Sequence, residues 1–410
     1  MSDASAHPAA ASASLEIPSI PAVSLAHTGN RQIALAFLRS AQGSMTLTAL
    51  PWVVMGAGGK SSDVGLAGTV VTITYLAACL VAPRIGRTVG RQRLIVAACS
   101  FTLLILAAMA SSRSVLALFL LAGLFGITAG LFWPTVVGWL SAGQQGDPLN
   151  RRLGRFNASW SAGAIVGTLA AGPLLSRTWL PFVVAFAIEC VTIALAATAP
   201  RPTQDPVETA APDTSGPVAP NAMMRVAALA FAAAWLGMGV IRYPLVSAIK
   251  ELSLGPRTHS VIAAALSLTL SIAFYLLARS NRWQHSSAVI LSAGLVASIA
   301  LGAIALCGSG WSMGLLVIVA SAGMAVCSQA DLYWRASTKR DRAASMASHE
   351  VLASVVFAVG SWGGGWVGAR FGISWTFPAA ASLMLVAMAA AAVAATSRKR
   401  ASASPAGAAR

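Results

Sequence analysis

The chain has 410 residues, of which 57% are hydrophobic and only 10% are charged, and its mean hydropathy is +0.73. About a quarter of the residues in a water-soluble domain are charged, so this composition excludes a soluble globular protein. The net charge of +16 would suit a nucleic-acid-binding protein, but the basic residues stand in short clusters between long apolar runs. That arrangement is typical of the inner loops of a membrane protein, so we expect a lipid bilayer and no nucleic acid as a partner.

Twelve apolar stretches follow one another along the chain, and each is long enough to cross a bilayer as a helix of about 20 residues. The first six are 33–55, 64–83, 94–111, 115–140, 156–176 and 179–199, and the second six are 226–247, 259–278, 287–307, 313–333, 350–369 and 374–396. The sequence therefore predicts an all-α integral membrane protein with 12 transmembrane helices in two six-helix bundles, at 33–199 and 226–396.

Three further segments are polar or biased in composition. Residues 1–32 are rich in Ala, Ser and Pro and hold no apolar core of the signal-peptide type, which predicts a disordered cytoplasmic tail. Residues 200–225 are rich in proline and predict a flexible cytoplasmic linker between the bundles, and residues 397–410 predict a basic cytoplasmic tail.

The distribution of basic residues tests the number of spans. If both termini are cytoplasmic, twenty of the 28 Lys and Arg residues fall in the tails and inner loops, six fall in the outer loops, and Arg39 and Arg242 lie within spans. A wrong number of spans would scramble this alternation. The pattern therefore predicts twelve spans with both termini cytoplasmic, and we expect a multi-pass protein of the plasma (inner) membrane.

The two halves also align with each other as repeats. The alignment places Gln42 over Trp235 and Pro51 over Pro244. Two parallel repeats about an axis along the membrane normal are typical of transporters whose substrate site lies between the repeats. We expect a monomer whose halves rock to expose a central site to each side in turn.

The loop after the second span carries a family resemblance. The segment from Pro83 to Arg93 resembles the signature loop of the major facilitator superfamily, a Gly-x-x-x-Asp-Arg-x-Gly-Arg-Arg/Lys pattern, in which Gly90, Arg91 and Arg93 match. Pro83 replaces the leading glycine and Arg87 replaces the acid. In the family that acid braces neighbouring helix ends in the outward-open state, so the resemblance implies a gate that is built differently here.

The fifth span resembles the glycine motif of the superfamily's drug:proton antiporters at Gly154, Gly163, Gly167 and Gly172, although Thr168 replaces the motif's proline. The resemblance implies proton-coupled efflux, with the glycines serving close helix packing and rocking. Three glycines of the eleventh span are expected to repeat that packing: Gly360, Gly364 and Gly368.

Polar residues within the spans are candidates for the substrate cavity, because a charge at mid-bilayer costs roughly 2.5–3.5 kcal/mol. Arg39, Gln42 and Thr46 form one stripe on the first span, which should face protein or a water-filled cavity. Alternatively, Arg39 snorkels to the interface. Trp235 and Arg242 follow the same pattern in the seventh span, although Arg242 could also meet only the outer headgroups. The other cavity candidates are Thr72, Tyr75, Trp133, Asn157, Trp160, Tyr243 and Gln329.

Proton coupling needs a group that titrates, and three acids are candidates. Glu189 lies near the middle of the sixth span without a partner nearby in sequence; it could also be protonated and inert. Asp331 lies one turn before Arg335, so an ion pair along the helix is the simpler interpretation. Glu350 begins the eleventh span, where a helix N-terminus favours an anion.

No histidine or cysteine spacing indicates a metal site or a cofactor, so the expected partners are a small organic solute and protons. The sequence therefore predicts a secondary active transporter, with proton-coupled efflux as the leading interpretation and metabolite uptake as the alternative. Two other classes stay open: a membrane-embedded enzyme, which would have to use His349 and Glu350, and a sensor without flux.

Overall fold

The computed structural model describes residues 22–141, 146–199, 221–280, 283–336 and 342–403. Within these ranges the backbone forms thirteen α-helices, one 3-10 turn at Ile304–Leu306 and no strand. The helices are α1 (Ala22–Gly56), α2 (Ser61–Val89), α3 (Arg91–Ser111), α4 (Val115–Ser141), α5 (Gly146–Leu174), α6 (Leu180–Ala197), α7 (Asn221–Arg242), α8 (Leu245–Glu251), α9 (Pro256–Ala278), α10 (Ser287–Ala303), α11 (Gly310–Ala336), α12 (Arg342–Phe371) and α13 (Ile373–Ala403).

Twelve of these helices coincide with the twelve predicted spans, and the predicted fold class is confirmed. Ten of them are long and apolar enough on their own to cross a membrane. The other two, α1 and α5, have 35 and 29 residues and are therefore long enough. They are less apolar because they carry the polar residues discussed below. The remaining helix, α8, has only 7 residues and belongs to the connection between α7 and α9.

The helix boundaries differ from the sequence prediction at a few points. The second span continues to Val89, through most of the segment expected as a loop, and the chain turns at Gly90 with a φ of 92°. The seventh helix stops at Arg242 because Pro244 lacks an amide hydrogen and disfavours helical backbone at Tyr243. Helix α1 begins at Ala22, inside the expected tail, while most of that tail and of the linker lies outside the described residues.

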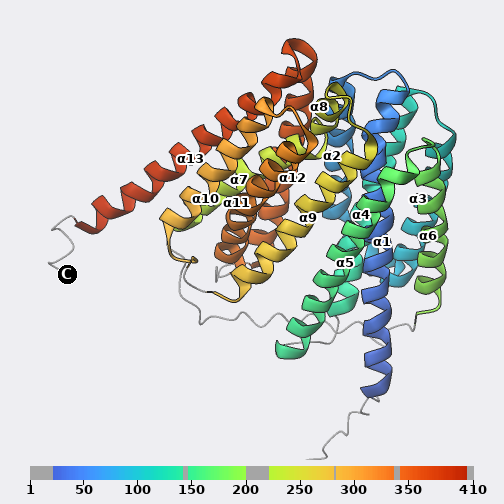
Figure 1. Cartoon of the computed structure of the whole chain (residues 1–410). Helices are drawn as coiled ribbons and strands as arrows, with labels where there is room; N and C mark the ends of the chain where they lie inside the picture. The colour runs from blue at the N-terminus through green and yellow to red at the C-terminus, as the bar shows by residue number, and fades with distance from the viewer. Residues whose placement is uncertain (1–21, 142–145, 200–220, 281–282, 337–341, 404–410) are drawn as a thin grey trace, which may run out of the picture.

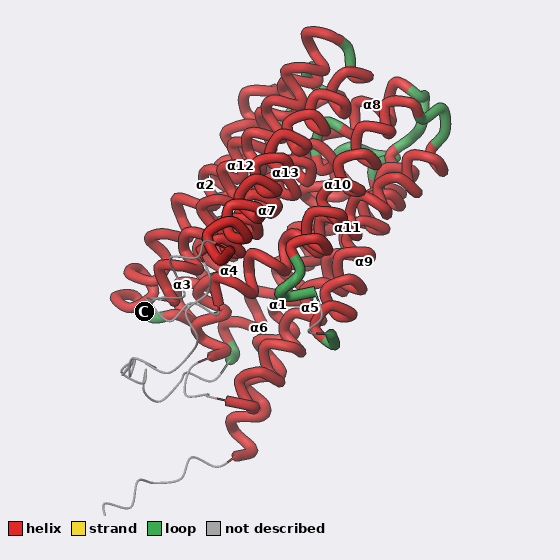
Figure 2. The backbone as a smooth tube through the Cα atoms, turned by 90° about the vertical axis from the view of Figure 1, so that its left-hand side faces the viewer, coloured by secondary structure: helices red, strands yellow, loops and turns green. Residues whose placement is uncertain are grey.

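The helices form two bundles: the N bundle (α1–α6) and the C bundle (α7–α13). The end of the molecule at which α6 ends and α7 begins is called here the tether face, and the opposite end, which carries α8, is called the far face. In Figure 1 the two bundles lie together at the far face and diverge towards the tether face. Figure 1 shows that α10 and α13 of the C bundle slant relative to α1 of the N bundle, and Figure 2 shows the same arrangement of helices turned by 90°.

Glycines bring helices within each bundle into backbone contact. A β-carbon at Gly163 of α5 would lie 2.3 Å from the carbonyl oxygen of Phe37 in α1, and one at Gly167 would lie 1.9 Å from that of Ala41. In the C bundle, a β-carbon at Gly360 of α12 would lie 2.1 Å from the carbonyl oxygen of Leu236 in α7. The α5–α1 and α12–α7 contacts are equivalent under the repeat alignment.

Glycines also join the two bundles at the far face. A β-carbon at Gly65 of α2 would lie 2.2 Å from the carbonyl oxygen of Ser361 in α12, and one at Gly172 of α5 would lie 2.7 Å from the Ser260 hydroxyl of α9. Each contact pairs a helix of one bundle with a helix of the other. Three predicted packing glycines remain. A β-carbon at Gly364 or Gly368 would lie 2.9–3.0 Å from neighbouring side chains of the described residues, whereas one at Gly154 would meet nothing within 4 Å among them.

We predict that Gly163→Leu destabilises the folded protein, because the new side chain must push α5 away from α1. Overpacking of this kind costs about 1–3 kcal/mol. The measurement is the melting temperature in detergent of protein that has inserted into membranes normally. Gly154→Leu on the same helix is the matched control and should melt like the wild type; equal melting of all three proteins would contradict the packing account.

Candidate functional site

A cluster of buried polar side chains lies inside the N bundle. Arg39 of α1 is 2% exposed, and its Nη1 lies 2.9 Å from Oε1 of Glu189 in α6, which is fully buried. Nη1 also donates to Gln42 Oε1 at 2.8 Å, and the Gln42 amide donates to Thr46 Oγ1 at 3.2 Å. Two more helices complete the cluster, which we call the N-bundle cluster: Arg39, Gln42, Thr46, Thr102, Thr128 and Glu189.

The partners of Arg39 explain how a charge is accommodated at this depth. Nη2 donates to Thr102 Oγ1 of α3 at 3.1 Å and lies 3.5 Å from Thr128 Oγ1 of α4. The guanidinium carbon also stands 5.5 Å and 5.3 Å from the ring centres of Phe125 and Phe132, which adds cation–π attraction. A buried charge needs both a counter-charge and hydrogen bonds, and Arg39 has both.

This placement decides between the alternatives that the sequence left open for these residues. Arg39, Gln42 and Thr46 are at most 2% exposed and pair within the N bundle, so of the two expected environments the stripe faces protein in this structure. Arg39 does not snorkel to the interface. Glu189, which has no partner nearby in the sequence, is paired with Arg39 across 150 residues of chain.

The signature loop lies at the tether face. Arg91 Nη1 donates to the carbonyl oxygen of Gly138 in α4 at 2.8 Å, and the Gln92 amide donates to carbonyl oxygens at the end of α6, the nearest at 2.9 Å. Gly90 makes the turn between α2 and α3, while Arg93 is exposed. The loop therefore braces the ends of α4 and α6 through arginine and amide donors.

A second cluster, the C-bundle cluster of Asp331, Arg335 and His349, joins α11 to α12. Asp331 is fully buried, and its Oδ2 accepts from Arg335 Nε at 2.6 Å. His349 Nδ1 lies 2.6 Å from the same oxygen, and Arg335 also donates to Ser348. One carboxylate oxygen thus holds a guanidinium from its own helix and an imidazole from the next.

A chain of aromatic contacts leads from the C-bundle cluster towards the far face. The His349 ring stacks on Phe231 of α7 with centroids 4.3 Å apart. Phe231 contacts Trp235 at 5.7 Å, Trp235 contacts Phe357 of α12 at 6.0 Å, and Phe357 meets Tyr243 edge-on at 6.1 Å. We call His349, Phe231, Trp235, Phe357 and Tyr243 the aromatic chain.

The aromatic chain ends where the bundles meet. Tyr243 is 2% exposed, and a β-carbon at Gly68 of α2 would lie 2.4 Å from its ring. Nearby, the Thr69 hydroxyl of α2 donates to the carbonyl oxygen of Ala358 in α12 at 3.0 Å. On the other side of the interface, the indole of Trp52 donates to His259 Nδ1 of α9 at 3.2 Å. The far-face closure therefore includes side-chain contacts as well as the glycine contacts.

Glu350 lies at the interface between the bundles. It is exposed on α12 and close enough to Tyr75 and Cys79 of α2 to interact electrostatically with both. Arg242 is half-buried at the end of α7 and is electrostatically close to His259. Both groups therefore stand where α2 or α9 meets the other bundle.

The remaining cavity candidates are dispersed. Trp160 and Asn157 are exposed on α5 and share a hydrogen bond of 3.1 Å. Trp133 of α4 packs edge-on against Phe156 with centroids 6.1 Å apart. The others are half-buried on α2 and α11: Thr72, Tyr75 and Gln329.

The sequence did not reveal the partner of His349 or the roles of Thr102 and Thr128. The sequence analysis considers His349 only together with its neighbour Glu350, whereas the structure pairs it with Asp331. The signal for that pairing is the short connection between two antiparallel helices, which brings the end of one beside the start of the next. Thr102 and Thr128 carry no such signal, because threonine is common in apolar helices and usually bonds only to its own backbone.

The C-bundle cluster ties α11 to α12 through one carboxylate oxygen. Asp331 Oδ2 accepts from Arg335 and lies within hydrogen-bond distance of His349 Nδ1, a strong pairing for as long as the carboxyl carries its charge. Its Oδ1 is buried and has no hydrogen-bond partner among the described residues. The described residues also include no group of three or more His, Cys, Asp or Glu that would hold a metal ion.

The sequence profile of the Major Facilitator Superfamily matches residues 33–334. The fold resembles three solved transporters. A bacterial homolog of the human lysosomal transporter Spinster, inward-facing and unoccupied, gives a TM-score of 0.75 at 13% identity over 92% of this chain and 97% of that one. The nucleoside transporter NupG gives 0.72 at 12% identity over 90% and 98%, and the POT family transporter PepTSo gives 0.70 at 14% identity over 93% and 99%. No curated protein sequence matches the chain.

We predict that breaking the Arg39–Glu189 pair from one side destabilises the protein more than removing both charges. Glu189→Gln or Arg39→Met leaves an uncompensated buried group and should cost roughly 3–5 kcal/mol. The double variant Arg39→Met/Glu189→Gln should recover part of that loss. The free energy of unfolding in mixed micelles is the measurement, and strictly additive losses in the double variant would refute coupling between the two side chains.

Proposed function

The chain belongs to the Major Facilitator Superfamily, whose profile matches most of its length, and from this we propose that it is a secondary active transporter that exports a small organic solute in exchange for protons. It is an integral, multi-pass membrane protein. The proposal places it in the plasma membrane as a monomer, with both termini on the cytoplasmic side, because most Lys and Arg residues then lie on that side.

Alternating access is the proposed mode of transport. The far-face contacts between α2 and α12 and between α5 and α9 close one side, and the bundles diverge towards the tether face (Figure 1). With the tether face cytoplasmic, this arrangement is an inward-facing state. The resemblance to the inward-facing Spinster homolog supports that assignment. Transport then requires the bundles to rock until the far-face contacts separate and the tether ends approach each other.

The substrate is proposed to bind between the bundles. The half-buried and exposed side chains on the helices that face the opposite bundle are Thr72, Tyr75, Trp160, Asn157 and Trp235. They offer aromatic faces together with hydroxyl and amide groups, and Glu350 and Arg242 add one charge of each sign at the same interface. Such a lining suits an organic molecule with an aromatic or heterocyclic part.

The C-bundle cluster is the proposed site of proton coupling, and the shared Oδ2 of Asp331 is the observation that carries this proposal. Among the described residues the charged or titratable groups at this oxygen are Arg335 and His349. Protonation of Asp331 would free His349, whose ring is stacked on α7 at Phe231. A proton would thereby change how α11 and α12 are tied to α7.

Glu189 is a weaker candidate for coupling. Its partner Arg39 is a permanent cation inside the N bundle, and all partners of that arginine come from the same bundle. Protonating Glu189 would leave the Arg39 charge without its counter-charge at a depth where charges are costly. We therefore assign Glu189 the role of stabilising the N bundle, and Glu350 a place on the interface with α2.

Export is proposed over uptake because of the glycine motif in α5. Gly163, Gly167 and Gly172 of that motif make close contacts in this structure, with α1 and with α9. The motif is incomplete, since Thr168 replaces its proline and Gly154 packs against nothing. Flux along the pH gradient, in the same direction as protons, is the experimental outcome that would favour uptake.

We predict that Asp331→Asn abolishes proton-driven transport and preserves substrate exchange, because an amide keeps the shape but cannot release a proton. A compound that raises the melting temperature of the purified protein serves as the substrate probe. Its flux is measured in proteoliposomes with an imposed pH gradient, and its exchange is measured without a gradient.

Glu189→Gln is the comparison variant in this assay. If the coupling proposal is right, the protein that folds in this variant should still respond to the pH gradient. Gradient-driven flux that survives in Asp331→Asn would remove Asp331 from coupling. Loss of the gradient response in the folded fraction of Glu189→Gln alone would move the coupling site to the N bundle.

We also predict that Gly68→Leu shifts the protein towards the far-face-open state, because the new side chain would overlap the ring of Tyr243. Spin labels at Lys60→Cys and Glu251→Cys, both exposed at the far face, report the separation of the bundles in a cysteine-free background. Their mean distance should increase in Gly68→Leu. Gly56→Leu, a far-face position with open space, is the control, and an unchanged distance in Gly68→Leu would count against rocking at this contact.

A further inference from the structure

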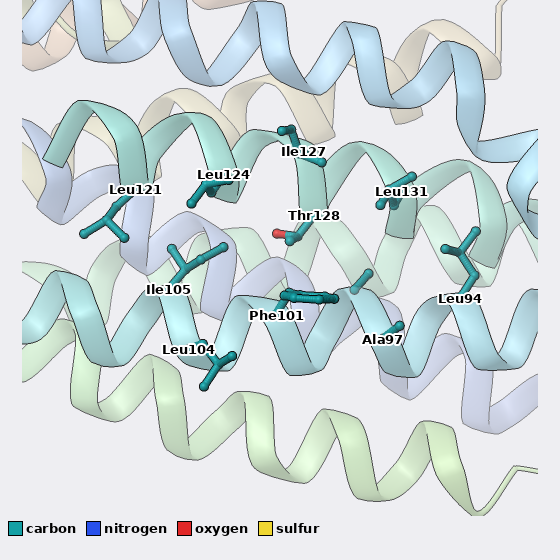
Figure 3. A pocket seen from close by; sticks show the side chains of 11 residues that line it. Leu94, Ala97, Phe101, Leu104, Ile105, Leu121, Leu124, Ile127, Thr128 and Leu131 are labelled. Atoms are coloured by element: carbon teal, nitrogen blue, oxygen red, sulfur yellow. The ribbon is translucent and has the colours of Figure 1, made fainter. Parts of the chain in front are cut away.

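An apolar groove runs between α3 and α4 on the outside of the N bundle, away from the interface with the C bundle. Its volume is about 550 Å³. Figure 3 shows the side chains of both helices that border it. The lining residues are Leu94, Ala97, Ala98, Phe101, Leu104, Ile105, Leu121, Leu124, Ile127, Thr128 and Leu131.

The groove opens towards the lipid. Phe101 and Leu104 of α3 are 62% and 65% exposed, and Leu124 of α4 is 49% exposed. From Leu94 to Ile105 the groove follows α3 for about 16 Å, at 1.5 Å per residue. That length is about half of the roughly 30 Å hydrocarbon thickness of a bilayer, which is the depth of one leaflet.

A second, smaller hollow adjoins the groove at its tether-face end. It lies between α3 and α6, has a volume of about 300 Å³ and is lined by Gln92, Arg93, Val96, Ala97 and Ala197. Ala97 lines both spaces, so the two hollows adjoin at this residue of α3. Arg93 thus stands one residue before Leu94, at the tether-face end of the apolar groove, and about one turn before the shared Ala97.

Arg93 has the position and charge of a headgroup contact. It is exposed and makes no hydrogen bond or ion pair with any other residue in the described part of the chain. It lies at the start of α3, whose 21 residues match the thickness of the bilayer, so the side chain reaches the level of the headgroups. Arg84 and Arg87 at the end of α2 add positive charge to this side of the molecule.

From this juxtaposition we propose that the outer face of α3 binds an anionic glycerophospholipid of the leaflet at the tether face. One acyl chain occupies the α3–α4 groove, and the phosphate lies in the smaller hollow against Arg93. Charge selects the lipid, because an anionic headgroup gains from an unpaired arginine, whereas a zwitterionic one brings its own cation. This site is separate from the proposed transport path.

The floor of the groove connects the lipid to the interior of the N bundle. Thr128 is the only polar residue that lines the groove, and its hydroxyl accepts from Thr102 Oγ1 at 2.8 Å. The same hydroxyl lies 3.5 Å from the Arg39 guanidinium. An acyl chain in the groove would therefore cover the side chains around Thr128 that separate the N-bundle cluster from the membrane, and it would exclude water from them.

The test measures binding of dioleoyl-phosphatidylglycerol and dioleoyl-phosphatidylcholine to the purified full-length protein by native mass spectrometry. We expect phosphatidylglycerol to bind more tightly, and Arg93→Gln to weaken it roughly fivefold, the size expected for one arginine at a membrane surface. Phosphatidylcholine binding should not change in that variant. Ala97→Phe, which fills the groove at an exposed position, should weaken both lipids.

Two control variants separate the site from general effects of charge and bulk. Arg113→Gln removes an exposed arginine beyond the far end of α3, and Ala107→Phe adds the same bulk to α3 outside the groove; neither should change lipid binding. Melting temperatures equal to the wild type show that the variants are folded.

Three outcomes would overturn the proposal. Equal binding of phosphatidylglycerol by wild type and Arg93→Gln would remove the headgroup contact. Unchanged lipid binding in Ala97→Phe would remove the acyl-chain contact. Glycerol 1-phosphate that binds as tightly as the whole lipid would show a site for free anions and not for a membrane lipid.

Discussion

Helices in a bilayer gain little by burying apolar side chains against one another, because lipid tails are as apolar as leucine. Their association depends on close backbone approach, and in this protein glycines provide it at several helix crossings, four of which bear on the arrangement of the bundles. Gly163 and Gly360 hold α5 on α1 and α12 on α7 within the bundles, while Gly65 and Gly172 hold the bundles together at the far face. In the proposed alternating-access mechanism the first pair holds each bundle together, and the second pair forms a contact that has to separate during transport. In that mechanism, glycines within a bundle belong to contacts that persist, and glycines between the bundles belong to contacts that open.

The two buried clusters of charged residues also differ in a way that suits different roles. In the N bundle the Arg39 guanidinium is buried and has partners on its own helix and on α3, α4 and α6, which suits a fixed element, although Glu189 Oε2 has no hydrogen-bond partner among the described residues. In the C bundle the Asp331 carboxylate is shared by Arg335 and His349, and the imidazole is in turn stacked on α7. A carboxylate with two cationic or protonatable partners has several pairings of similar kind, which suits a switch. The repeat is thus symmetric in its backbone packing and asymmetric in its charges.

Much of the fold was predictable from the sequence, because apolar runs and alternating basic loops report directly on spans. The partner of each buried charge was harder to predict from the sequence. Asp331 and Arg335 lie one turn apart on one helix, and that pair is visible in the sequence, but Arg39 and Glu189 are joined across 150 residues by the packing of α1 against α6. The polar stripe of Arg39, Gln42 and Thr46 shows which residues share a face of α1. It does not show whether that face meets the interior of its own bundle or a path between bundles, because both environments exclude lipid.

The distance along the chain between Arg39 and Glu189 has a consequence for biosynthesis. The ribosome adds roughly 5–20 residues per second, so α1 enters the membrane on the order of ten seconds or more before α6 exists. During that time the arginine has no counter-charge, and the first helix has to be held by the insertion machinery, by water or by the interface. Arg39 of the nascent N bundle gains its counter-charge only when α6, which carries Glu189, has been inserted. A ribosome that stalls before that point leaves a fragment with an exposed intramembrane cation, which is a feature that membrane quality control can recognise.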